Sequence, residues 1–170
     1  MSNKNPNEES NSTKTSKISV LMAPSKKYDN DWSREEDDVC RFHSKFSLPI
    51  SDVPQFANHQ DMMYRLCFLS EELNETMRAY ANDDLEEFFD GLIDLVYVAL
   101  GTAVWCGLPW KEGWDAVHAA NMTKVRVANP EDSKRKHVCD VVKPEGWQKA
   151  NLKQILKEAG WTEPIKDHAQ

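Results

Sequence analysis

The chain has 170 residues, six of them glycine, and a formal net charge of −7. This length suits one domain, and the wide spacing of the glycines excludes the GxGxxG and GxxxxGK[ST] loops that hold phosphates in dinucleotide-binding and P-loop proteins. An acidic chain also lacks the attraction to phosphate backbones and anionic lipids, so nucleic acid and membrane are not expected partners.

Residues 1–17 contain no large apolar residue after Met1 and predict a disordered tail before a single all-α domain over residues 18–170. The four cysteines are scattered without a CxxC pair, and the polar start is unlike a signal peptide. We therefore expect a cytoplasmic protein with reduced thiols.

Apolar residues recur at three- and four-residue steps over most of residues 33–124, which is the amphipathic helix pattern. Helix caps near Ser33 predict a first helix that ends at about Phe46, and the next helices are expected over residues 59–81, 85–106 and 110–124. The inner side of the fourth would carry Trp114, Val117, His118 and Met122. Short connections between four helices predict a four-helix-bundle-like core.

The C-terminal third differs in charge from the rest of the chain. Residues 125–146 are polar and basic with two prolines and predict an irregular segment, and a short helix is expected over residues 152–159. The uncharged window at residues 95–110 is shorter than the roughly 20 residues that cross a bilayer, so a buried helix is expected there.

Two groups of acids fall on neighbouring predicted helices. Glu71, Glu72 and Glu75 share one edge of the second helix, for which a solvated acidic face is the alternative. On the third helix Glu87, Asp90 and Asp94 follow one stripe, and Asp94 lies within an apolar run. A buried carboxylate is costly unless it is compensated, either by a metal ion or by a base from another helix.

Converging carboxylates suit hard cations such as Mg²⁺ or Mn²⁺, which keep open positions for substrate phosphates. A ferritin-like di-iron site is disfavoured because no Glu is followed by a His three residues later. The basic C-terminal third could meet a polyphosphate through its lysines and arginine, although each of these side chains taken alone could be a solvated surface charge. They are Lys124, Lys134, Arg135, Lys136 and Lys143.

The run Glu71-Glu72-Leu73-Asn74-Glu75, with Glu87-Phe88-Phe89-Asp90 on the next helix, resembles the EExxE…ExxD signature of the all-α nucleotide pyrophosphohydrolases, the MazG-like and phosphoribosyl-ATP pyrophosphohydrolase-like group. The likeness covers roughly residues 39–124 and is similar to forms often carried by bacterial viruses. Asp94 matches the acid that relatives embed in an apolar run, which leaves Glu87 or Asp90 to complete the site.

The resemblance implies hydrolysis of a nucleoside triphosphate between the α and β phosphates. Glu72, Glu75, Asp90 and Asp94 would hold Mg²⁺, or Mn²⁺, with Glu87 as the alternative to Asp90. Glu71 would orient or deprotonate the attacking water. The expected substrate contacts are Asn121, Lys124, Tyr97 and Arg65.

We expect a homodimer or homotetramer whose packing completes the nucleotide pocket. Three alternatives remain open at this point: a phosphoribosyl-ATP-type pyrophosphohydrolase, a non-catalytic helical protein that binds a nucleotide through the same metal site, and a structural bundle with a solvated acidic face. The sequence does not indicate which base and sugar are preferred.

Overall fold

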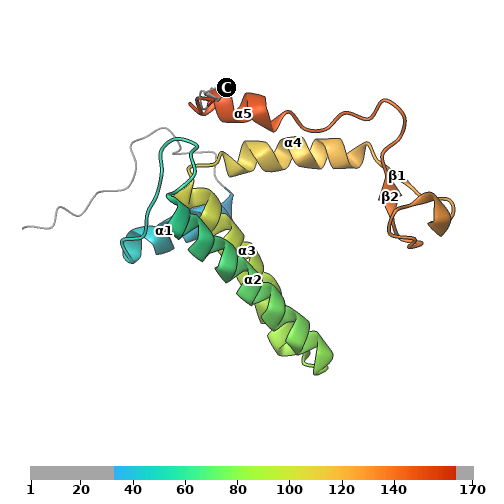
Figure 1. Cartoon of the computed structure of the whole chain (residues 1–170), viewed down its shortest axis with the longest axis horizontal. Helices are drawn as coiled ribbons and strands as arrows, with labels where there is room; N and C mark the ends of the chain where they lie inside the picture. The colour runs from blue at the N-terminus through green and yellow to red at the C-terminus, as the bar shows by residue number, and fades with distance from the viewer. Residues whose placement is uncertain (1–32, 164–170) are drawn as a thin grey trace, which may run out of the picture.

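The structure is a computed structural model that describes residues 33–163, so the predicted tail over residues 1–17 lies outside the described residues. The described part is mainly helical, which confirms the all-α class (Figure 1). Its helices are α1 (Arg34–Lys45), α2 (His59–Ala81), α3 (Leu85–Trp105), α4 (Trp110–Met122) and α5 (Leu152–Glu158). The basic segment contains a 3₁₀ turn, η1 (Pro130–Asp132), and two short antiparallel strands, β1 (Val125–Arg126) and β2 (Val141–Val142).

Polar side chains fix where the first three helices begin. Ser33 Oγ accepts a hydrogen bond from the backbone N–H of Glu36 at 3.3 Å, and Asn58 Oδ1 accepts one from Asp61 at 2.9 Å. Asp84 Oδ1 accepts from the N–H of Glu87 at 3.1 Å. These caps satisfy backbone donors that have no partner within the helix, and they explain why the predicted helix starts agree with the structure.

The packed core is made by α1, α2 and α3. Helices α2 and α3 run side by side along most of their length, and α1 packs across α3 (Figure 1). Val39 and Cys40 of α1 meet Leu100 and Val104 of α3 in a buried apolar cluster, against which Ile50, Tyr97 and Trp110 pack. Trp110, the first residue of α4, is thus the point at which α4 joins this core.

The fourth helix of the expected bundle lies differently. After Trp110, α4 leads away from the α2–α3 pair and packs against α5 (Figure 1). The side chains predicted for its inner side are therefore exposed within one chain: Trp114 and Met122 are 62% and 71% exposed, and Val117 and His118 are also exposed. The prediction of an inner side on α4 was wrong because the spacing of apolar residues identifies the apolar face of a helix but not the element that packs against it.

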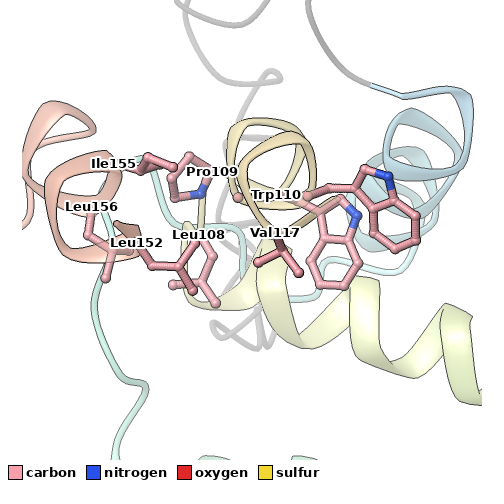
Figure 2. A pocket seen from close by; sticks show the side chains of 9 residues that line it. Leu108, Pro109, Trp110, Val117, Leu152, Ile155 and Leu156 are labelled. Atoms are coloured by element: carbon pink, nitrogen blue, oxygen red, sulfur yellow. The ribbon is translucent and has the colours of Figure 1, made fainter. Parts of the chain in front are cut away.

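A cavity of about 360 Å³ lies between α4 and α5 (Figure 2). Its walls are apolar side chains from the two helices and the turn before α4, among them Trp110, Val117, Leu152 and Leu156. None of the acids or bases singled out in the sequence lines it. This cavity therefore lacks the groups that would hold a metal ion or a phosphate.

Helices α2 and α3 each expose an apolar stripe. On α2 the buried side chains include Arg65, Glu72 and Thr76, so the packed face is partly polar. The exposed apolar residues recur at steps of seven, four and three along α2 and at steps of four and three along α3, and together we call them the α2–α3 apolar face: Leu66, Leu73, Met77 and Tyr80 with Leu85, Phe89, Leu92 and Val96. By length and composition α3 could also cross a membrane, a test that core helices pass as well. An apolar face of this extent indicates a further partner.

Glu36, in the first turn of α1, is a buried acid that the sequence did not single out. It is 6% exposed, and its Oε2 has no hydrogen-bond partner among the described residues. Burial, and secondarily the negative charge of Glu112, raises the pKa of Glu36 to about 7. The proton is bound more tightly in the folded chain than in the unfolded one, so folding is favoured at acidic pH.

We expect the protein to lose stability as the pH rises from about 5 through the Glu36 pKa of about 7. Glu36→Gln should remove part of this loss, because the amide carries no charge to bury. Thermal unfolding of both proteins between pH 5 and pH 8 measures the difference. Equal pH slopes for the two proteins would contradict the assignment.

Candidate active site

A glycine lets the two acid-bearing helices approach each other. A Cβ atom placed on Gly91 of α3 would lie 2.5 Å from Thr76 Oγ1 and 3.2 Å from Thr76 Cα on α2. The Thr76 hydroxyl is turned back along its own helix, where it donates to the Glu72 carbonyl at 2.8 Å. The two helices therefore touch at a point flanked by Glu72 and Glu75 on one side and by Asp90 and Asp94 on the other.

Glu72 is the most buried of these acids. It is 8% exposed, and no base pairs with it among the described residues. Burial raises the pKa of its carboxyl, and the charges of Asp94, Glu75, Glu71 and Asp90 raise it further, in that order. Negative groups thus surround a partly desolvated carboxylate without local compensation.

Asp94 has the same character on the facing helix. It is partly buried, and burial is the main cause that raises the pKa of its carboxyl, followed by the charges of Asp90 and Glu75. The acids of α2 and α3 are therefore close enough to act on one another. The sequence prediction that they converge from two helices agrees with this electrostatic coupling.

The remaining acids are exposed at the rim. Glu75 accepts a hydrogen bond from Arg78 Nη2 at 3.1 Å, a surface ion pair of small energetic worth. Glu71 and Asp90 are exposed and contribute to the field at Glu72. Glu87 is exposed in the first turn of α3, and its charge is not among those that shift Glu72 or Asp94. Of these two acids, Asp90 is therefore the one whose charge acts on Glu72 and Asp94.

The donors fit a hard divalent cation by their chemistry, because they are carboxylates whose mutual repulsion a cation would relieve. Within residues 33–163, however, no three His, Cys, Asp or Glu side chains are arranged tightly enough to hold a metal ion. The contact of α2 with α3 brings acids of both helices near one another without forming such a group. The identity of the ligands stays a prediction.

Two of the predicted substrate contacts face the core instead of the acids. Arg65 is 5% exposed, and it donates to the Val98 carbonyl at 2.8 Å and to Thr102 Oγ1 at 3.1 Å. Its guanidinium also lies over the Trp105 ring. Tyr97 packs edge-on against Phe42 of α1. The structure places both residues where they support α3.

Arg65→Lys is expected to lower stability more than it affects substrate binding. Lysine cannot reproduce the two directed hydrogen bonds, each of which is worth roughly 1.5–3 kcal/mol when the donor is charged. Thermal unfolding of the metal-free protein gives the first quantity, and KM for the substrate gives the second. A large rise in KM at unchanged melting temperature would instead support the predicted contact of Arg65 with the substrate.

Asn121 and Lys124 lie at the end of α4 that is remote from the α2–α3 pair (Figure 1). Within one chain they are consequently not brought together with the carboxylates. Beside them the indole N–H of Trp147 donates to the Ala120 carbonyl at 2.9 Å, and the Lys124 ammonium is 5.9 Å from the centre of the Trp147 ring.

Gly91 and Thr76 were not identified as site residues from the sequence. Gly91 did carry a signal, because glycine inside a helix costs up to about 1 kcal/mol and therefore indicates a close approach. Thr76 carried none, since threonine is common in helices for other reasons. Its position became apparent only when the partner helix was in place.

A family model described as phosphoribosyl-ATP pyrophosphohydrolase matches residues 39–121. The matched segment begins in α1, includes all the candidate carboxylates and ends at Asn121 near the end of α4. The basic segment and α5 lie beyond it. No curated protein matches the chain.

Proposed function

Because residues 39–121 form a domain of the phosphoribosyl-ATP pyrophosphohydrolase family, we propose that the chain is a divalent-metal-dependent nucleoside triphosphate pyrophosphohydrolase. The substrate is a ribo- or deoxyribonucleotide, and the products are the nucleoside monophosphate and pyrophosphate. The observation that carries the proposal is the close contact of α2 and α3 at Gly91 and Thr76, beside which burial raises the pKa of Glu72 on one helix and of Asp94 on the other.

In this proposal Glu72, Glu75, Asp90 and Asp94 hold the ion. When bound, Mg²⁺ or Mn²⁺ would shield the phosphate charges and make water more acidic. Glu71, exposed next to Glu72, orients the attacking water and accepts its proton. A bond forms between the water oxygen and the α phosphorus, the bond from that phosphorus to the bridging oxygen breaks, and pyrophosphate leaves. Lys124 and Asn121 contact the substrate.

A second copy of the chain completes the site in this proposal. The α2–α3 apolar face needs a partner, and Asn121 and Lys124 lie away from the carboxylates of their own chain. A homodimer or homotetramer would meet both requirements. Light scattering of the full chain should give a mass of two or four protomers, and Met77→Glu with Phe89→Glu should shift it toward the monomer; a monomeric wild type would contradict this part.

Pyrophosphate release tests the activity. The full chain is incubated with Mg²⁺ and a panel of canonical and modified dNTPs, ribonucleotides and phosphoribosyl-ATP. Release with a nucleoside triphosphate is the expected result. Release with phosphoribosyl-ATP alone would assign the narrower substrate, and binding without release from any nucleotide would favour a non-catalytic nucleotide-binding protein.

Charge-neutralising variants test the site. Glu75→Gln and Asp94→Asn should each lose most of the release, whereas the matched control Glu86→Gln removes an exposed acid from the first turn of α3 and should keep it. A comparison of Asp90→Asn with Glu87→Gln decides which of these acids belongs to the site. Release that is unchanged in both Glu75→Gln and Asp94→Asn would show that these acids are not the metal site.

A further inference from the structure

Trp147 gathers two lysines at the C-terminal end of α4. Its ring centre is 4.4 Å from the Lys143 ammonium and 5.9 Å from the Lys124 ammonium. The indole N–H is bonded to the Ala120 carbonyl, which fixes the ring against the last turn of α4. Lys124 comes just after α4 and Lys143 just after β2, so one ring joins two separate segments of the chain.

Of the other three bases singled out in this region, two are already paired and the third, Lys134, is exposed. Arg135 forms an ion pair with the buried Asp140, and Lys136 pairs with Glu131 at 3.1 Å. No carboxylate among residues 33–163 pairs with Lys124 or Lys143. Of the five bases that the sequence singled out, these two are therefore held in place by a ring and keep their ammonium donors for another partner.

The chemistry of this arrangement favours a ligand with several negative oxygens. Two ammonium groups that share one ring repel each other, and an exposed cation–π contact, worth roughly 0.5–1 kcal/mol, orients a lysine without neutralising it. Each ammonium has three donors. A polyphosphate chain offers several charged oxygens along its length, and lysine binds phosphate as a point charge.

We propose that Trp147 is a positioning residue that holds Lys124 and Lys143 as a clamp for the polyphosphate chain of the nucleotide. The identity of the ligand as a nucleotide polyphosphate rests on the proposed function. Anion binding by the clamp does not, because the segments that carry the two lysines, after α4 and after β2, lie away from the α2–α3 pair (Figure 1).

Calorimetric titration of the full chain with inorganic tripolyphosphate in excess chelator tests the clamp without metal or turnover. Lys143→Gln and Lys124→Gln should each raise Kd about tenfold, which corresponds to about 1.4 kcal/mol. Trp147→Leu should raise it similarly, whereas Trp147→Phe keeps an aromatic face and should retain most of the affinity. Lys149→Gln, an exposed control with the same charge change, should have little effect.

Unchanged affinity in Lys124→Gln and Lys143→Gln overturns the proposal, as does an equal loss in Lys149→Gln, which would indicate non-specific charge attraction. If Trp147→Leu fails to fold in a thermal melt, the two lysine variants and Trp147→Phe decide the outcome. Tripolyphosphate binding without pyrophosphate release from any nucleotide would leave the clamp and reject the proposed function. Pyrophosphate release from a nucleotide, together with unchanged tripolyphosphate affinity in the two lysine variants, would support the proposed function and reject the clamp.

Discussion

Replacing Glu72 with glutamine is expected to stabilise the metal-free protein and to abolish its turnover. The Glu72 carboxyl is buried among other acids, and its pKa is raised by burial first and then by Asp94. An amide of the same shape removes that repulsion and the desolvation of a charge, while it removes a predicted metal ligand. We expect turnover to fall by at least about 100-fold, or about 2.7 kcal/mol of activation free energy.

The raised pKa of Glu72 determines whether stability rises or falls with pH. The folded-state pKa of Glu72 lies above its value in the unfolded chain, so its contribution to stability is present at acidic pH and is lost as the pH rises through the raised pKa. In chelator, melting temperatures should therefore fall with rising pH more steeply for the wild type than for Glu72→Gln. Mg²⁺ should raise the melting temperature of the wild type alone, by ligand linkage.

A destabilised Glu72→Gln variant that still hydrolyses nucleotide would contradict both halves of this prediction. The conservative variant Glu72→Asp serves as a partner measurement. It keeps the charge and shortens the side chain, so it should keep the steep pH dependence of the wild type while it loses activity.

Gly91→Ala is expected to separate α2 from α3 and to disable the site without replacing any of its predicted ligands. The added methyl would stand 2.5 Å from Thr76 Oγ1 and 3.2 Å from the Thr76 backbone, so the helices must shift. Overpacking of this kind typically costs about 1–3 kcal/mol. For a chain of this size each kcal/mol lowers the melting temperature by roughly 2–4 °C. The acids on either side of the contact would move apart, and Mg²⁺ should then stabilise the variant less.

Gly113→Ala is the matched control, since Gly113 also lies within a helix and the nearest atom to its added methyl is Leu152 Cδ2 at 3.9 Å. There the gain in helix propensity, up to about 1 kcal/mol, should make the variant equal to or more stable than the wild type. A Gly91→Ala protein as stable as Gly113→Ala would show that α2 and α3 are not in close contact at Thr76. Thr76→Ala combined with Gly91→Ala should recover part of the loss, because it removes the hydroxyl oxygen that would stand 2.5 Å from the added methyl.

The helices themselves could be predicted from the sequence because their signals are local. Caps such as Ser33 and Asp84 fix the beginnings, and apolar residues at three- and four-residue steps fix the extents. The acids of the EExxE run and Asp94 were also predicted to converge, since a carboxylate in an apolar run needs compensation. The electrostatic coupling of Glu72 to Asp94 agrees with that expectation.

The partner of each helix face could not be predicted in the same way. Met77 and Tyr80 belong to the apolar stripe that defined α2, yet they are 61% and 77% exposed, while the polar Arg65 and Thr76 are buried. When two faces of a helix are able to pack, the local sequence does not indicate which face packs against other helices of the same chain. The same ambiguity explains why Trp114 of α4, expected on an inner side, is exposed. Arg65 is a polar residue that is buried. Its hydrogen bonds to Val98 and Thr102 stabilise it there, and no sequence pattern predicts them.

The most direct test of the proposed chemistry is the identity of the products. A nucleoside triphosphate that is hydrolysed by the full chain with Mg²⁺ should give the monophosphate and pyrophosphate in equal amounts, as ³¹P spectra or anion-exchange chromatography would resolve. Formation of the diphosphate and orthophosphate, in a reaction that still depends on Glu72 and Asp94, would contradict cleavage between the α and β phosphates.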